Sequence, residues 1–368
     1  MDSQRLRPLL TARGPFASIY FEDSHDTQDA AAQVDLKWRA LREQLEKLGA
    51  SKSVTADIER AVMDLRPPIG RSGRAVVAGA DGVVLNEHLL RPTAAPIVRV
   101  SELPYVVPIV EHGFTDLNYL LVAVDHTGAD ITVHVDGTLR TETVDGSGYP
   151  VHKASGPETA GYGDPQLRTE EAARKNMRAV ADRVAQLLGD AGAEAVFVIG
   201  EVRSRSDFRA TVPHQVRALI VELPVGARHS GHDFDEVQDA IEAELLKRRL
   251  AMIDGAAQRF TAEVGRRSGL AAEGLGPVCS GLRQGAVETL IIGDLGEETV
   301  VADDELTTVA PNADVLSEQG AAPARTLRAD EALPMFAVSV GASLVRTDER
   351  IAPADGVGAV LRYAPTLH

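Results

Sequence analysis

The sequence predicts a multidomain protein of mixed α/β and α+β class. Its 368 residues are enough for two or three domains. Runs of alternating apolar and polar residues are separated by turn residues, a pattern that predicts antiparallel strands. In the middle of the chain a buried-strand pattern follows a long amphipathic helix, which is typical of a sheet with a crossover helix. We therefore expect three domains, at residues 1–117, 118–228 and 229–368.

The predicted N-terminal domain, residues 1–117, mixes helices and strands. Apolar residues recur at spacings of four and three through residues 29–48 and Gly49 follows them, which predicts an amphipathic helix ending at the glycine. A second helix is expected near residues 55–65. The segment RAVVAGADGVVLNEHLL predicts a β-hairpin that turns at residues 80–82, and GPFASIYFE and PYVVPIVEH are strand-like.

The predicted middle domain, residues 118–228, is rich in strands. Three apolar-alternating runs lie in NYLLVAVDHTGADITVHVDGTLRTETVDG, and the buried-strand patterns AVFVIGEV and RALIVELP follow later. Between them lie a long loop at residues 152–168 and a long helix, for which Thr169 is the predicted N-cap. The loop consists of glycine, proline and polar residues, so it cannot bury enough apolar surface to order itself. It is therefore either slack or shaped by a contact outside the protein.

The predicted C-terminal part, residues 229–368, begins with one long helix or two successive helices at residues 232–267. An α/β sandwich follows. In it VCSGLRQGAVETLIIGDLG predicts a helix and then a strand, ETVVA a strand, ADEALPMFAVSVGASLV a helix, and GVGAVLRYA a terminal strand.

The charge of the chain is strongly acidic and unevenly distributed. The formal net charge is −16, and residues 229–368 hold 12 Lys+Arg against 23 Asp+Glu, a balance of −11. Because a phosphate backbone repels such a molecule at long range, the charge argues against non-specific nucleic-acid binding, and we expect no DNA partner. Any contact with a polyanion is expected in the first two domains.

Neither a metal, a cofactor nor a membrane segment is expected. Cys279 is the only cysteine, so there is no internal disulfide and no thiolate cluster, and the ten histidines include no His-Glu-x-x-His spacing. No run of about 18 apolar residues exists. The start, MDSQRLRPLLTARG, lacks the apolar core of a signal peptide. The expected location is the cytoplasm.

A cationic face on the long helix is the first candidate site. The buried stripe of this helix is predicted to consist of Ala173, Met177, Val180, Val184 and Leu187. The opposite arc carries Arg168, Arg174, Lys175 and Arg178, with Arg183 at its edge. Two interpretations stay open. The arc is either a solvated face that pairs with Glu170, Glu171 and Asp182, or a face that contacts phosphates, for which arginine offers a planar donor fork.

Two neighbouring segments favour the phosphate interpretation. In GEVRSRSDFRATVP, Arg203, Arg205 and Arg209 directly follow a predicted strand, where a loop would project them. In an acidic protein such clustering indicates a partner. In the long loop, the glycines on either side of Tyr162 leave its ring free to stack on a base, although an ordinary turn around a half-buried tyrosine stays an alternative. Further loop candidates are His152, Lys153, Asp164 and Gln166.

Stretches distributed over the whole chain resemble the archaeo-eukaryotic release factor and Pelota family. They are GPFASIYFEDSHDT, GRAVVAGADGVVLNEHL, PYVVPIVE, VAVDHTGAD, DGSGYPVHKASG, GYGDPQLRTEEAARKNMRAVADRV, FVIGEVRSRSDF, LRQGAVETLIIGDLGEETVV and RIAPADGVGAVLRYA. The order of parts is similar too, with a long loop that leads into a basic helix inside a β-rich middle domain. The resemblance extends to the bacterial branch, which includes Balon-type ribosome hibernation factors and their mycobacterial relatives.

This resemblance implies three domains arranged as in archaeo-eukaryotic release factors, in a tRNA-shaped protein that occupies the ribosomal A site. The N-terminal domain would face the decoding centre and the middle domain the peptidyl-transferase centre. The C-terminal domain would face elongation factor Tu and the stalk base, and its acidic balance suits protein better than rRNA. The implied partner is the bacterial ribosome, with elongation factor Tu and stalk-base proteins as further partners, and no membrane.

The sequence departs from release factors at both of their functional motifs. It contains no Gly-Gly pair, so the Gly-Gly-Gln tip is absent, and Pro165 restricts the backbone beside Gln166. The Asn-Ile-Lys-Ser motif is absent as well. We therefore expect a non-enzymatic hibernation factor that blocks translation without peptide hydrolysis. Two alternatives stay open: a peptidyl-tRNA hydrolase in which Gln166 or His152 handles water, and a protein-interaction module that never visits the ribosome.

The expected contacts follow from these segments and include no catalytic residue. For large-subunit rRNA they are His152, Lys153, Tyr162, Gln166, Arg168, Arg174, Lys175, Arg178, Arg203 and Arg205. For small-subunit rRNA they are Arg71, Arg74, Asn86 and His88, which project from predicted turns or strand ends. Because the contacts are to phosphates, the affinity should fall steeply with salt.

Overall fold

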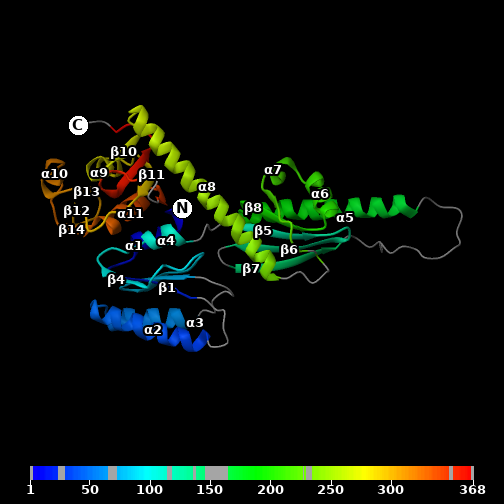
Figure 1. Ribbon diagram of the computed structural model, residues 1–368, viewed down its shortest axis with the longest axis horizontal. Helices are drawn as coiled ribbons and strands as arrows, with labels where there is room; N and C mark the ends of the chain where they lie inside the picture. The colour runs from blue at the N-terminus through cyan, green and yellow to red at the C-terminus, as the bar shows by residue number, and fades with distance from the viewer. Residues whose placement is uncertain are drawn as a thin grey trace. The chain divides into compact units, whose positions relative to one another are not determined.

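The computed structural model describes residues 3–23, 30–64, 73–113, 118–135, 138–145, 165–226, 228, 234–347 and 351–365. The chain divides into two compact units. One, the discontinuous unit, combines residues 1–114 with residues 249–368; the other, the middle unit, comprises residues 115–248. Separate sheets are each partnered by helices (Figure 1), so the predicted mixed α/β multidomain class is confirmed. The division into three domains stays a prediction.

The first sheet of the discontinuous unit has four antiparallel strands in the order β3-β2-β1-β4. They are β1 (Phe16–Glu22), β2 (Gly73–Gly79), β3 (Gly82–Leu89) and β4 (Ile97–Ser101). The predicted hairpin joins β2 to β3 and is confirmed. Strand β1 is buried from Phe16 to Phe21 because both faces of the sheet are covered. Ile19 packs in the core beneath α2 (Ala30–Lys47) and α3 (Lys52–Asp64), whereas Tyr20 lies in the opposite core.

The segment PYVVPIVEH was expected to form a strand. It contains helix α4 (Val107–His112) instead. Pro108 lies in the first turn of this helix, where a missing N–H removes no intrahelical hydrogen bond. The edge strand of the sheet is β4 instead. All five residues of β4 are half-buried, so its sequence lacks a clear alternation of apolar and polar residues. The periodicity therefore did not predict this strand.

The C-terminal part of the discontinuous unit holds two further sheets, in the orders β10-β16-β11-β15 and β13-β12-β14. The strands are β10 (Ala271–Glu273), β11 (Val287–Ile292), β12 (Thr299–Ala302), β13 (Val309–Ala310), β14 (Arg325–Arg328), β15 (Ser343–Arg346) and β16 (Val357–Leu361). The helices are α9 (Leu275–Arg283), α10 (Ala313–Glu318) and α11 (Ala329–Ser339). The segment ADEALPMFAVSVGASLV, predicted as one helix, forms helix α11 followed by strand β15. The helix ends because Gly341 adopts a φ of 67°, which leads the chain into β15.

One hydrophobic core joins the N-terminal and C-terminal parts of this unit. Phe16 and Val77 of the first sheet belong to the same buried cluster as Leu333 and Phe336 of α11. Two short N-terminal helices, η1 (Ser3–Leu6) and α1 (Pro8–Thr11), add their apolar side chains to it. Because apolar burial is the main favourable contribution to folding, we expect these two distant parts of the sequence to unfold together.

The middle unit is built on one five-stranded sheet in the order β7-β6-β5-β8-β9. Its strands are β5 (Tyr119–Val124), β6 (Gly128–Val135), β7 (Thr138–Asp145), β8 (Ala195–Gly200) and β9 (Ile220–Glu222). Strands β5, β6 and β7 form an antiparallel meander, whereas β8 lies parallel to β5 and β9 parallel to β8. Helix α5 (Pro165–Ala191) precedes β8, so the predicted crossover helix is confirmed.

Helices cover both faces of this sheet. On one face α5, α6 (Val202–Thr211) and α7 (His214–Arg217) share a core that contains Val184 and Phe208. On the other face, Ile241 of α8 (Phe234–Arg266) packs in a second core with Phe197. Residues 232–267, predicted as one or two helices, thus form a single helix over 234–266, and from Arg249 onward it belongs to the discontinuous unit.

Two boundaries in the middle unit differ from the prediction. Helix α5 begins at Pro165 rather than after Thr169, because proline in the first turn has its φ already set for a helix. Gln166 and Arg168 therefore lie within the helix and not in a loop. Residues 202–211, expected as a loop, form α6, in which Phe208 supplies the buried contact.

Candidate functional site

The cationic arc of α5 is exposed, as its sequence pattern predicted. Met177, Val180, Val184 and Leu187 are buried, so the apolar stripe faces the sheet. Arg174, Lys175 and Arg178 are exposed on the solvent side. Gln166 and Arg168 belong to the first turns of α5, but their side chains lie outside the described residues. The described part of the arc thus presents three cations of the same helix to solvent.

The arginines that follow β8 have different surroundings. Arg203 is exposed at the start of α6, with its Nε 3.9 Å from Asp207 Oδ2. Arg205 is directed toward the protein: its Nη1 donates to the carbonyl oxygen of Leu223, and its Nε lies 3.8 Å from Glu222 Oε2. Helix α6 therefore adds Arg203 to the exposed cations, whereas Arg205 does not project from a loop as expected.

Arg183, at the edge of the arc, is held by a strand. Its Nε and Nη2 donate to Glu142 of β7, at 2.5 and 2.8 Å from the two carboxylate oxygens. The hydrogen bond from Arg183 lowers the pKa of Glu142, and the hydrogen bond from Glu142 raises the pKa of Arg183. This bidentate pair fixes α5 on the sheet and removes Arg183 from the cations available to a partner.

The topology gathers the exposed cations near one edge of the sheet. Strands β5 and β8 are parallel, so their carboxyl ends lie at the same edge, where β8 leads into α6 and Arg203. Asn176 of α5 donates its Nδ2 to the carbonyl oxygen of His126, which follows β5, at 3.3 Å. The basic arc of α5 therefore borders the edge at which ligands commonly bind in α/β sheets.

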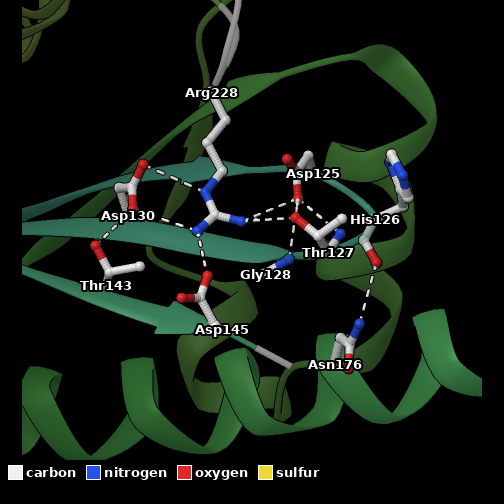
Figure 2. Close-up of polar contacts among 9 residues, drawn as sticks. All are labelled: Asp125, His126, Thr127, Gly128, Asp130, Thr143, Asp145, Asn176 and Arg228. Carbon is white, nitrogen blue, oxygen red and sulfur yellow. Dashed lines mark hydrogen bonds and ion pairs between the residues drawn. The ribbon is translucent and has the colours of Figure 1, made fainter. Parts of the chain in front are cut away.

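At this edge a buried arginine is surrounded by carboxylates (Figure 2). Arg228 Nη2 donates to Asp145 Oδ1 at 2.9 Å, and Nε donates to Asp130 Oδ2 at 3.2 Å. Arg228 Nη1 donates to Asp125 Oδ1 at 3.1 Å and to Thr127 Oγ1 at 2.9 Å. The side chain of Arg228 is 2% exposed. One guanidinium thus joins the turn after β5, strand β6 and the end of β7, and we name this set the Arg228 cluster.

The turn after β5 is itself built around a carboxylate. Asp125 Oδ1 accepts hydrogen bonds from the backbone N–H groups of Thr127 and Gly128, at 2.7 and 2.9 Å. Burial raises the pKa of Asp125, but these hydrogen bonds and the charge of Arg228 outweigh it and hold the pKa below its usual value. Asp125 is therefore ionised and pairs with the guanidinium.

Sequence reasoning missed this cluster. From the sequence, the turn was seen only as part of a strand-rich segment, and Arg228 was assigned no role. The signal available was the Asp-x-Thr-Gly turn itself, which marks a carboxylate at the end of β5. Nothing in the sequence shows that Arg228, 103 residues away, supplies the guanidinium.

In the N-terminal part, Arg74 is not a projecting side chain, which corrects the expectation. It is 1% exposed in β2, and its guanidinium donates to the backbone of α3 and pairs with Asp23 at 3.4 Å. Arg74 Nε also donates to Asn86 Oδ1 at 3.0 Å. Asn86 and His88 are half-buried on β3 and face Arg74 across the hairpin. Arg71 lies outside the described residues.

The remaining predicted contacts can be placed only in part. His152, Lys153, Tyr162 and Asp164 lie outside the described residues. Among the described residues, no three His, Cys, Asp or Glu side chains gather as metal ligands would. Cys279 is buried, which raises the pKa of its thiol to about 12. Within the same residues, no helix is both long and apolar enough to span a bilayer.

The chain is similar in sequence to a known protein family and to two mycobacterial proteins. Residues 118–266, which contain the basic arc and the Arg228 cluster, match the model of bacterial archaeo-eukaryotic release factor family 2. The chain is also 50% identical over 366 residues to the uncharacterized proteins Rv2629 and MT2704 of Mycobacterium tuberculosis, covering 100% of this chain and 98% of theirs. Residues 118–266 therefore belong to a bacterial release-factor-like family, and the chain as a whole belongs to the same family as these mycobacterial proteins.

The chain is also similar, at low sequence identity, to several solved structures. They include the archaeal translation termination factor aRF1, with a TM-score of 0.27, 15% identity and 99% of both chains covered. Pelota from Archaeoglobus fulgidus has a TM-score of 0.37 and 13% identity, over 98% of this chain and 92% of that chain. A model of ribosome-bound archaeal Pelota and ABCE1 has a TM-score of 0.44 and 13% identity, over 99% and 95%. The family assignment depends on the sequence comparisons.

Proposed function

We propose that this protein binds the vacant A site of the bacterial ribosome and blocks translation without hydrolysing peptidyl-tRNA, as a hibernation factor does. The observation that carries the proposal is an exposed cationic arc, at Arg174, Lys175 and Arg178, inside the region that matches a release-factor family. The chain as a whole is acidic, with a net charge of −16, so a local gathering of arginine and lysine indicates a polyanionic partner.

The middle unit would contact large-subunit rRNA through this arc. Arg203 at the start of α6 extends it. The predicted contacts His152, Lys153, Tyr162, Gln166 and Arg168 are proposed to bind rRNA as well. Arg205 is engaged by Leu223 and Glu222, so we assign it to holding α6 in place. Guanidinium groups suit phosphate oxygens because they donate two parallel hydrogen bonds.

The other parts of the molecule would complete the A-site contact. On the N-terminal sheet, Asn86 and His88 stay candidates for small-subunit rRNA together with Arg71. Arg74 is buried and would act by holding the hairpin in shape. The acidic C-terminal part, residues 229–368, suits protein surfaces, and elongation factor Tu and stalk-base proteins are its proposed partners.

The absence of hydrolysis is proposed from the sequence. No Gly-Gly pair occurs in the 368 residues, so the backbone that holds the catalytic glutamine of release factors is not encoded. Purified protein should therefore occupy ribosomes that carry peptidyl-tRNA without releasing the peptide. Peptide release that disappears in Gln166→Ala would assign the protein to rescue instead.

Charge reversal on α5 tests the binding surface. Arg174→Glu with Arg178→Glu should weaken binding to vacant ribosomes by about 3 kcal/mol, on the order of a hundredfold, because each of the two lost charged contacts contributes about 1.5 kcal/mol. The slope of log K against log salt should become shallower by about two. The matched control is Arg266→Glu with Arg267→Glu, two exposed arginines at the end of α8 that give the same change in net charge. Equal binding losses in both double variants would show that only total charge matters and would refute this surface.

A further inference from the structure

The Arg228 cluster lies between two points of the chain that flank residues 146–164. Asp145, held by Arg228 Nη2 at 2.9 Å, is the last described residue before that segment, and α5 begins at Pro165 directly after it. The turn that Arg228 also holds is tied to α5 through Asn176 and the carbonyl oxygen of His126, at 3.3 Å. The guanidinium of Arg228 therefore connects the end of β7 with helix α5, which carries the basic arc. It holds Asp145 directly, and it reaches α5 through the turn that Asn176 contacts.

The geometry of the cluster requires arginine. Three carboxylates and a hydroxyl approach the guanidinium from different sides, and Nε, Nη1 and Nη2 each donate to at least one of them. A lysine ammonium is a single point of charge and cannot reach Asp125, Asp130 and Asp145 together. Gly128 contributes by its small size, since a Cβ there would collide with the carbonyl oxygen of Val144 in β7.

The members of the Arg228 cluster differ in how far they are buried. The Arg228 and Asp125 side chains are largely buried, whereas the side chain of Asp145 is 76% exposed. An exposed carboxylate contributes little to the stability of a fold. The contact between Arg228 and Asp145 therefore fixes where β7 ends relative to α5 more than it stabilises the unit.

We propose that Arg228, acting through Asp145, is a positioning residue for the ribosome-binding surface: it sets the spacing between the end of β7 and the basic arc of α5. The proposal rests on the proposed function. It predicts that binding depends on Asp145 although this carboxylate is negative and lies at an edge facing a polyanion. Simple charge counting predicts the opposite, because removing a negative charge should favour contact with phosphates.

Asp145→Asn separates these two predictions by the sign of its effect. If Arg228 positions the surface, Asp145→Asn binds vacant ribosomes at least about threefold more weakly than the wild type, since the hydrogen bond from Arg228 then lacks the negative charge that strengthens it. Its thermal unfolding midpoint should stay within about 2 °C of the wild type, as for other exposed charges. Asp145→Glu, which keeps the carboxylate, should recover most of the binding.

Glu194→Gln is the matched control. Glu194 is an exposed carboxylate of the same unit, directly before β8, so the substitution changes the net charge equally without touching the Arg228 cluster. It should bind as well as the wild type or slightly better. Arg228→Lys should lose binding as Asp145→Asn does, because lysine cannot join the three carboxylates.

The outcomes distinguish the two levels of the proposal. A wild-type protein that does not bind ribosomes overturns the proposed function and the positioning role together. A wild type that binds, with an Asp145→Asn variant that binds equally or more tightly, overturns the positioning role alone. Loss of binding accompanied by a large fall in the unfolding midpoint would place Asp145 in folding and also overturns it.

Discussion

Arg99 of β4 forms a partly buried pair of salt bridges between the N-terminal and C-terminal parts of the discontinuous unit. Its Nη2 lies 2.9 Å from Asp330 Oδ2, and its Nη1 lies 3.2 Å from Glu331 Oε1, both at the start of α11. The guanidinium also lies 3.8 Å from the centre of the Tyr105 ring. The substitution Arg99→Met keeps an unbranched apolar stem and removes the guanidinium, with its charge and its hydrogen-bond donors.

The magnitude follows from what Arg99 leaves behind. The side chain of Glu331 is 4% exposed, and burial already raises the pKa of this carboxyl above its ordinary value. Removing one partner of a buried pair costs about 3–5 kcal/mol. Arg99 itself is 25% exposed, so we expect a somewhat smaller cost, about 2–4 kcal/mol. For a unit of this size the unfolding midpoint should fall by about 5–15 °C.

Two probes can follow this effect from opposite ends of the sequence. Trp38, the only tryptophan, is buried beneath the first sheet and reports on the N-terminal part by fluorescence. Amide hydrogen exchange in α11 and β11 reports on the C-terminal part. Because one core contains both parts, both probes should shift together in Arg99→Met. Adding Glu331→Gln should recover most of the lost stability, since the unpaired carboxylate is then removed.

Arg325→Met is the matched control for this prediction. Arg325 also links the two parts, through Glu102 at 3.3 Å, and pairs with Asp304 at 2.8 Å; its side chain is 36% exposed and both carboxylates are largely exposed to solvent. It should cost no more than about 1 kcal/mol. Equal costs for the two substitutions, or a fluorescence transition that does not move while exchange in α11 accelerates, would refute the reasoning.

Two further predictions concern a close approach and a buried histidine. Gly128→Ala should lower the free energy of unfolding of the middle unit in urea by about 1–3 kcal/mol, because the added Cβ collides with the Val144 carbonyl oxygen. Gly189→Ala in helix α5 is the control: its added Cβ contacts no other atom, so it should raise the free energy of unfolding by up to about 1 kcal/mol. Similar effects would exclude the collision. Burial, followed by the charge of Arg74, lowers the pKa of His88 below its ordinary value of 6.5, so the unfolded chain binds a proton first. Stability of the discontinuous unit should therefore fall as the pH decreases from about 7.5 through 6.5, and His88→Gln should flatten that dependence. An unchanged slope would show that His88 does not titrate on unfolding.

Local sequence patterns predicted the long elements well. The periodicity of residues 29–48 corresponds to α2, and the turn at residues 80–82 to the β2–β3 hairpin. The apolar stripe of α5 and its exposed cations were both predicted, because a period of 3.6 residues fixes which side chains share a face. Short or half-buried elements were missed: β4 has weak alternation, and PYVVPIVEH has a β-like composition although it forms α4.

What the sequence by itself determined is therefore the class of the fold, the course of its long helices and hairpins, and the face on which the cations of α5 lie. Only the tertiary structure decided which charged side chains reach solvent. Arg74, Arg183, Arg205 and Arg228 are engaged by carboxylates or carbonyl groups, whereas Arg178 and Lys175 are exposed. The reason is physical: a guanidinium is engaged by the carboxylate or carbonyl groups that folding brings close to it, and these can be distant in the sequence. The partners of Arg183 and Arg228, Glu142 and Asp145, lie 41 and 83 residues away.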